Sequence, residues 1–311
     1  MLEIFGYTTD LANSGFRQVD LLGNIVKETN VERLNQQLQQ LNARTITVVH
    51  HEARRLDNGY YLILGMTEQI SDAQGPGLDI AGDMIILLDP DLNIRWFWDA
   101  FDHLDITRKA VLNETCATVI GGCVLFLASV ANDWTHGNSV ALTPDGNLIY
   151  SSRHQDWVFK IDFQSGEGDG HVIWRLGKDG DFTWQSTDPF PWFSHQHDPE
   201  FEDAGLMSVF DNGNTRVVQD GSGNSRGQVL SIDQQAMTVT PILNADLQTY
   251  SSALGSAERL SNGNHSFNAG YAPGLQSYVP EVTTSGDIVA QMHVAAQVYR
   301  SFRMRDLYTG E

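Results

Sequence analysis

Histidines gather in three short polar segments of this chain of 311 residues. Six of the ten histidines belong to these segments or lie close to them: His50, His51, His136, His154, His195 and His197. Imidazole titrates near neutral pH, and it can act as a nucleophile, a proton carrier or a metal ligand. A single histidine is more often structural, but this grouping predicts a reactive site if the fold brings the segments together.

Arg153, in the sequence Ser151-Ser152-Arg153-His154, helps to separate two chemistries for such a site. Neutral imidazoles bind zinc, copper or iron, but a permanent cation beside a dication is unfavourable. Arginine, protonated histidine and an amide such as Asn138 instead suit the oxygens of sulfate or phosphate. The sequence therefore predicts an oxyanion site without metal, in which one histidine attacks sulfur or phosphorus while other groups neutralise the oxygens.

The overall charge excludes several classes of partner. The chain has 39 acidic and 19 basic residues and a net charge of −20, so a nucleic-acid-binding surface is not expected. An anion would have to be held by a few local cations. No run of apolar residues is long enough to span a membrane, and Met1–Asp10 lacks the features of a signal peptide. Cys116 and Cys123 are expected to be either two buried thiols or one disulfide.

Two kinds of hairpin alternate along the chain and must position these segments. One is an apolar run closed by a turn and followed by a second run, at 19–26, 86–98, 158–176, 229–243 and 279–292. The other is a polar head, an Asn-Gly or Asp-Gly turn and an alternating strand, at 56–64, 143–152 and 260–267. A helix is expected near 30–41.

Alternating hairpins supply four antiparallel strands per repeat, which is the plan of a β-propeller blade. We expect an all-β, six-bladed β-propeller that forms a single domain over 1–311, with five or seven blades as alternatives and a β-sandwich as the rival fold. The polar heads begin the innermost strands and should meet at the central channel. His51 and His197 each stand eight residues before a turn glycine, Gly59 and Gly205, which predicts equivalent positions.

Four segments carry a family resemblance. HHEARRLDNG, THGNSV, SSRHQDWVFKID, and QHDP followed by FDNGN, resemble in this order the motifs of bacterial arylsulfate sulfotransferases. The resemblance extends from about Gly6 to the C-terminus. It implies a six-bladed propeller that uses no PAPS and no other cofactor. It further implies ping-pong transfer of a sulfuryl group from an aryl sulfate to a phenol through a sulfohistidine.

The resemblance also implies roles for individual residues. His197 would be the nucleophile, and the sulfate oxygens would be bound by His51, His136, Asn138 and Arg153. His50 is adjacent to His51 and is an alternative to it. His195 is an alternative to His197, because two residues apart on an extended strand they would share one face. Trp134 and Trp192 lie near the polar heads, so we expect them to contact an aryl substrate. The family's hydroxyl contact from a late blade has no clear match in this sequence, and Ser252 and Ser256 are the candidates for it. The partners would be small aryl sulfates and phenols, with no nucleic acid and no membrane, and the oligomeric state is left open.

Two features depart from the family pattern. The additional N-terminal β domain of some members is missing, and the two cysteines lie before His136 rather than before His197. Family resemblance suggests export to the periplasm, which the absence of a signal peptide leaves open. Two other functions are compatible with the sequence: hydrolysis by an arylsulfatase or phosphodiesterase on the same residues, and a propeller that only binds partners.

Overall fold

The computed structural model describes residues 1–117, 123–202, 205–221 and 223–304. The chain is all-β and its strands are arranged as a β-propeller. Within the described residues the strands form five sheets of three to six strands, so the predicted six blades of four strands each are not confirmed. The described helices include none that is long and apolar enough to cross a membrane.

Contacts divide the chain into two compact units, described here one at a time. The first comprises residues 1–140, 146–155 and 160–173, and the second 141–145, 156–159 and 174–311. The expectation of a single domain therefore stays a prediction.

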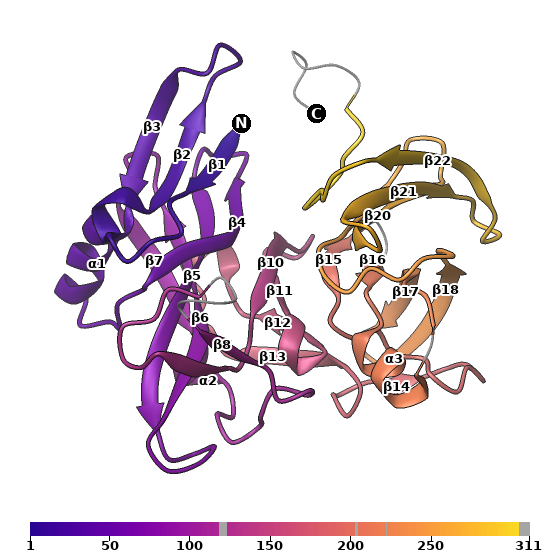
Figure 1. The fold of residues 1–311 in the computed structure, drawn as a ribbon, viewed down its shortest axis with the longest axis horizontal. Coiled ribbons are helices and arrows are strands. Elements are labelled where there is room, and N and C mark those ends of the chain that lie inside the picture. The colour runs from indigo at the N-terminus through magenta and orange to yellow at the C-terminus, as the bar shows by residue number, and fades with distance from the viewer. Residues whose placement is uncertain (118–122, 203–204, 222, 305–311) are drawn as a thin grey trace. The chain divides into compact units, whose positions relative to one another are not determined.

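The first unit contains two sheets (Figure 1). The smaller one has the order β1 (Leu2–Phe5), β2 (Gly15–Val19), β3 (Ile25–Asn30). The larger one has the order β4 (Val48–Arg55), β5 (Tyr61–Ser71), β6 (Leu78–Leu88), β9 (Val130–Asp133), β8 (Thr115–Ala117), and β7 (Ile94–Asp99) also pairs with β6. Strand β9 joins β6 in parallel, so this sheet is not the simple succession of hairpins that the repeat predicted.

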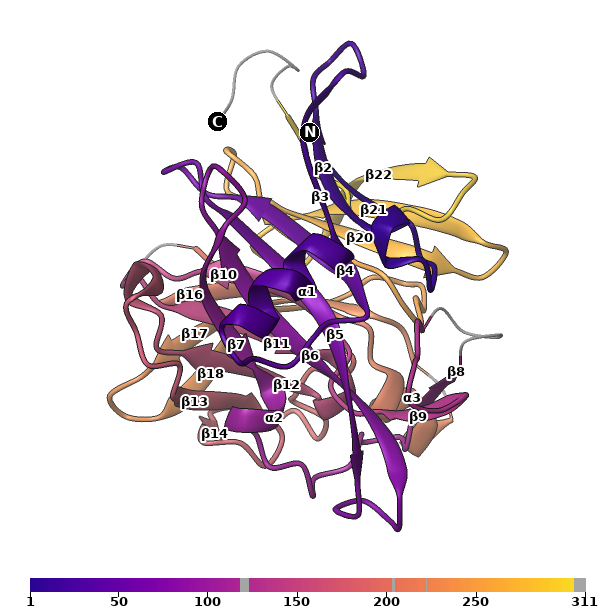
Figure 2. The same ribbon diagram turned by 90° about the vertical axis from the view of Figure 1, so that its left-hand side faces the viewer.

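The helix expected near 30–41 is α1 (Val31–Gln40). Asn30 caps it, because its side-chain oxygen accepts a hydrogen bond from the backbone N–H of Arg33. Leu34 and Leu38 lie one turn apart and are fully buried in a core that includes Ile63 of β5. Figure 2 shows α1 lying across the sheet that contains β4–β7. A short helix, α2 (Ala100–His103), follows β7.

A third sheet is formed by residues from the middle of the chain. Its order is β10 (Gly137–Leu142), β11 (Leu148–Ser152), β12 (Trp157–Ile161), β13 (Val172–Gly177). The one-turn 3₁₀ segment Arg153–Gln155 follows β11 directly, and two more such segments cover Leu11–Asn13 and Gln164–Gly166.

The second unit contains the remaining two sheets. One has the order β14 (Thr183–Trp184), β18 (Thr238–Asp246), β17 (Arg226–Asp233), β16 (Leu206–Asp211), β15 (His197–Phe201). The other has the order β19 (Ser256–Arg259), β20 (His265–Ala272), β21 (Gln276–Val282), β22 (Ile288–Val294). Phe210, Leu247 and Phe267 are central to the core of this unit. Helix α3 (Asn214–Asp220) follows β16.

Three predicted turns are present. Gly59, Gly146 and Gly263 adopt positive φ angles of 84°, 81° and 85° and connect β4 to β5, β10 to β11 and β19 to β20. Glycine adopts such angles without steric cost, which is why Asn-Gly and Asp-Gly predict tight hairpins. Asn212-Gly213 behaves differently, because it leads from β16 into α3 rather than into a hairpin.

Candidate functional site

A β-bulge in β4 sets the directions of the first two histidines. His50 pairs with Leu64, whereas the next paired residue of β4 is Ala53, opposite Ile63. His51 lies within the bulge at a φ of 56°, a conformation that is uncommon for a residue with a side chain. Bulges often redirect side chains beside functional sites, and this one gives two consecutive histidines different surroundings.

His50 is buried against Asp83 of β6, while His51 lies beside His136. The Nε2 atom of His50 is 3.0 Å from Asp83 Oδ1. The Nδ1 atoms of His50 and His51 are 2.7 Å apart. The ring centroids of His51 and His136 are 4.9 Å apart. Of the two adjacent histidines, His51 is therefore the one grouped with His136, and His50 links it to Asp83.

Asp83 connects several parts of the first unit. Its Oδ2 atom accepts hydrogen bonds from the Thr135 hydroxyl, from the backbone N–H of Gly137 at 2.6 Å and from the Tyr150 hydroxyl at 2.6 Å. Burial alone would raise the pKa of this carboxyl, but His50, Thr135 and Tyr150 together lower it to about 2. Asp83 is thus a buried anion that fixes both the first histidine pair and the segment before β10.

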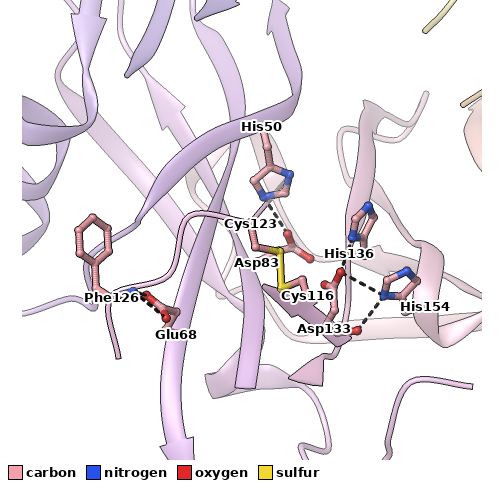
Figure 3. The surroundings of a disulfide bond; sticks show 9 residues. All are labelled: His50, Glu68, Asp83, Cys116, Cys123, Phe126, Asp133, His136 and His154. Atoms are coloured by element: carbon pink, nitrogen blue, oxygen red, sulfur yellow. Dashed lines mark hydrogen bonds and ion pairs between the residues drawn. A yellow bond between two sulfur atoms is a disulfide. The ribbon is translucent and has the colours of Figure 1, made fainter. Parts of the chain in front are cut away.

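His136 has a carboxylate partner of its own. Its Nδ1 atom is 2.7 Å from Oδ2 of Asp133, the last residue of β9 (Figure 3). Burial opposes ionisation of Asp133, yet its electrostatic interactions with His136 and His154 and its hydrogen bond with His136 outweigh burial and lower the pKa of this carboxyl. His136 also has a positive φ of 46°. Its side chain is 29% exposed, so the imidazole is accessible to a ligand while Asp133 fixes its Nδ1 atom.

Arg153 is held close to His136 by its backbone and by its neighbour His154. The Arg153 N–H donates to the carbonyl of His136 at 3.4 Å. Its Nη1 atom is 2.5 Å from His154 Nε2, and His154 Nδ1 is 2.7 Å from the carbonyl oxygen of Asp133. A carbonyl only accepts hydrogen bonds, so Nδ1 of His154 carries the proton and Nε2 accepts from Arg153. The guanidinium is therefore fixed beside the His136 segment.

Asp133, His136 and His154 also have donor atoms close enough for a metal ion, within 4.8 Å of one another. Two observations favour an anion instead. Both ring nitrogens of His154 already have hydrogen-bond partners, and Arg153 contributes a permanent cation to the same group of residues.

Two other predicted site residues of the first unit, Asn138 and Trp134, are buried. Asn138, in β10, is fully buried. Trp134 is 1% exposed, its indole N–H donates to the carbonyl of Arg108 at 2.8 Å, and its ring packs on Phe101. As placed, Trp134 is a packing residue rather than a wall for a substrate.

In the second unit, His197 begins β15 and faces an amide. Its Nδ1 atom is 2.7 Å from Oδ1 of Asn212, which directly follows β16. His197 pairs with Phe210, and the bulge of this strand comes afterwards, between His197 and Glu200. His197 and His51 were expected to occupy equivalent positions. This is wrong, because His197 is paired with the neighbouring strand whereas His51 lies unpaired within the bulge of β4.

His195 has a different partner from His197. Its Nδ1 atom and its backbone N–H lie 2.8 and 2.7 Å from Oδ1 of Asp156. The other oxygen of Asp156 accepts from the Thr215 hydroxyl at 2.6 Å. His195 precedes β15 with a φ of 52°, so the expectation that both histidines share one face of an extended strand is wrong. These contacts are those of a buried structural histidine.

Comparison with known proteins decides the family. The Arylsulfotransferase (ASST) family model matches residues 4–303. The chain belongs to the arylsulfotransferase family. That membership supports a sulfotransferase enzyme acting on small aryl substrates. Among curated proteins, no match was found.

Similarity to solved structures is low. A protein of unknown function from Bacteroides caccae is 9% identical with a TM-score of 0.42, over 96% of each chain. A periplasmic gluconolactonase of Pseudomonas aeruginosa is 9% identical with a TM-score of 0.43, over 97% of this chain and 83% of that one. Virginiamycin B lyase from Staphylococcus aureus is 13% identical with a TM-score of 0.36, over 76% of this chain and 53% of that one. These scores support no inference.

The sequence interpretation missed several side chains that surround the candidate residues of this arylsulfotransferase. Asp83 and Asp133 lie in strands that carried no motif. Asn212 belongs to the quoted FDNGN segment, for which the sequence predicted no role of this asparagine. The ring of Tyr299 is 6.3 Å from that of His197 and offers a half-buried aromatic surface that the sequence did not single out.

Two further predicted contacts lie in the second unit. Ser252 is half-buried, and its carbonyl accepts from the Asn214 side chain at 2.9 Å. Ser256 is fully buried, and its hydroxyl is bonded to the backbone of Ser301. Ser252 is therefore the more accessible of the two alternatives. Trp192 is half-buried and packs edge-on against Trp184.

Cys116 and Cys123 form a disulfide in this arylsulfotransferase (Figure 3). The sequence left open whether they were bonded. Cys116 lies in β8, which pairs with β9 through Cys116 and Ala131. Asp133 ends β9, so the disulfide braces the strand that holds the carboxylate partner of His136.

Proposed function

We propose that this arylsulfotransferase transfers a sulfuryl group from an aryl sulfate to a phenol by a ping-pong route, without PAPS. The observation that carries the proposal is the grouping of His51, His136 and Arg153 in a chain whose net charge is −20. A protein of this charge repels anions overall. Local cationic donors fixed by buried carboxylates are what a sulfate-binding site in such a protein requires.

In the first half-reaction, His197 attacks the sulfur of the donor. A bond forms between sulfur and the imidazole nitrogen, and the bond between sulfur and the aryl oxygen breaks. The phenolate leaves with the bonding electron pair and takes a proton from His136 or His51. Arg153, Asn138, His136 and His51 neutralise the sulfuryl oxygens as the charge redistributes.

In the second half-reaction, the acceptor phenol gives its proton to the same imidazole and attacks sulfur. The nitrogen–sulfur bond breaks and His197 is restored. Splitting the transfer lets donor and acceptor use the same site in turn. The carboxylates Asp83 and Asp133 already engage histidines, so neither is proposed as a base that activates water.

The test is the release of nitrophenol from 4-nitrophenyl sulfate with and without phenol. We expect slow release alone, a strong increase when phenol is added, phenyl sulfate as the product, and no change after exhaustive chelation. Equal rates with free sulfate as the product would indicate a hydrolase. No release under either condition would favour a binding role.

A further inference from the structure

We propose that Asn212 is a positioning residue that fixes the tautomer of His197, with the proton on Nδ1 and the lone pair on Nε2. The inference rests on the proposed role of His197 as the nucleophile, which it deepens by naming the attacking atom and the residue that selects it. Nothing in the sequence motifs assigned a role to Asn212.

The orientation of the Asn212 amide is determined by two backbone carbonyls. Its Nδ2 atom donates to the carbonyl of Ser251 at 2.8 Å and to that of Leu254 at 3.0 Å. These acceptors use both N–H groups of the amide. Exchanging oxygen and nitrogen would place the amide oxygen against two carbonyl oxygens, so the amide can take one orientation only.

The fixed amide in turn fixes the imidazole. Oδ1 of Asn212 is 2.7 Å from Nδ1 of His197, and an amide oxygen only accepts hydrogen bonds. Nδ1 must therefore be the protonated nitrogen. In a neutral imidazole the other nitrogen then carries the lone pair, so Nε2 is the atom that can bond to sulfur.

The surroundings of Asn212 hold this arrangement in place. Asn212 is fully buried, and its backbone carbonyl accepts from the Ser225 hydroxyl at 2.9 Å. The same hydroxyl accepts from the backbone N–H of Ser251 at 2.9 Å. One serine therefore connects Asn212 with the segment that orients its amide, which limits rotation of the side chain.

A neutral partner also suits a nucleophile. A carboxylate would stabilise the imidazolium, which has no lone pair for attack, whereas an amide selects the tautomer without adding charge. Asp198 directly follows His197, and Asp211 ends the neighbouring strand β16. Asp198 Oδ1 is 3.4 Å from Arg300 Nε, and Asp211 is bonded to Arg216 at 2.9 Å and Arg226 at 2.8 Å. Both of these carboxylates are thus paired with arginine.

The tautomer can be measured directly by long-range ¹H–¹⁵N correlation spectra of protein labelled on histidine nitrogens. The His197 signals are identified by their loss in His197→Asn. In the unaltered protein at mildly alkaline pH we expect a protonated Nδ1 and an unprotonated Nε2. A spectrum with the proton on Nε2 would overturn the inference, and this measurement needs no variant of Asn212 that folds.

Substitution then tests the cause. In Asn212→Leu we expect the His197 signals to move toward a mixture of both tautomers and kcat to fall by about 10²-fold or more, since a wrong tautomer is costly at a catalytic histidine. Asn214→Leu is the matched control, because it removes an asparagine bond to the carbonyl of neighbouring Ser252 without touching His197. It should leave the His197 signals unchanged. An unchanged tautomer in a folded Asn212→Leu protein would contradict the inference.

Failure of this inference is distinguishable from failure of the proposed function. If His197→Asn keeps full transferase activity, the proposed nucleophile is wrong whatever the spectra show. If His197→Asn is inactive while the proton is found on Nε2, the nucleophile stands and the role of Asn212 is wrong.

Discussion

His136 and His197 present the same ring atom to chemically different partners. Nδ1 of His136 faces the carboxylate of Asp133, whereas Nδ1 of His197 faces the amide of Asn212. A carboxylate favours a charged imidazole, and an amide fixes the orientation of a neutral one. Under the proposed function, this difference in partner suits His136 to binding an anion and carrying a proton, and His197 to acting as the nucleophile.

The largest expected effect follows removal of the proposed nucleophile. His197→Asn should abolish turnover, because no other imidazole in the described residues is bonded to Asn212. His195→Asn should retain turnover, since His195 is bonded to Asp156 within the buried interior. Steady-state rates with 4-nitrophenyl sulfate and phenol measure both. An inactive His195→Asn enzyme beside an active His197→Asn enzyme would show that His195 is the nucleophile.

A smaller loss is expected when the fixed cation is removed from the first region. Arg153→Leu should lower kcat by about 10²–10³-fold, the usual scale for one group that stabilises a developing oxyanion. Arg95→Leu is the control, because Arg95 pairs with Asp89 and its side chain is 58% exposed. An Arg153→Leu enzyme with normal kcat would remove the guanidinium from the proposed site.

Loss of the Asp133 charge should produce an effect of about tenfold together with a change in pH dependence. His136 and His154 keep the pKa of Asp133 below its usual range, so this carboxylate stays charged where imidazoles titrate. Asp133→Asn removes that charge from beside Nδ1 of His136, so the pH profile of kcat/KM should change. Asp169→Asn, beside the exposed His171, should leave the profile unchanged. An unaltered profile in Asp133→Asn would show that His136 acts without its carboxylate.

The disulfide should have the smallest effect on rate. Replacing Cys116 and Cys123 with serine should cost about 2.5 kcal/mol of unfolding free energy, from the entropy of so short a loop. The rate should fall only a few-fold, through looser pairing of β8 with β9 before Asp133, and the His197 tautomer should not change. Denaturant unfolding and the same rate assay measure the two quantities. A loss as large as that of Arg153→Leu would mean that the disulfide does more than brace β9.

The sequence predicted local features better than distant contacts. Asn-Gly and Asp-Gly located three hairpin turns because the required φ angles belong to the residues of the turn itself. The choice between His50 and His51 could not be made, because it depends on a bulge and on Asp83, more than 30 positions later in the chain. His195 and His197 seemed equivalent only while an extended strand was assumed for both.

The same limit applies to the partners of the histidines. Asp133 carries no motif, and Asn212 stands in a sequence typical of a turn, so neither could be recognised before the strands were paired. The number of blades is a related case. Six blades were predicted on the assumption that every sheet is a succession of antiparallel hairpins. In the structure, β9 pairs in parallel with β6, and β14 pairs in parallel with β18.

The most direct test of the account is to incubate the enzyme with an aryl sulfate and no acceptor, then map the peptides by mass spectrometry. We predict an added mass equal to one SO₃ group, located by fragmentation on His197 and lost when phenol is supplied. The adduct should form in His195→Asn and be absent from His197→Asn. An adduct on another residue, or free sulfate released without any adduct, would contradict the sulfohistidine route.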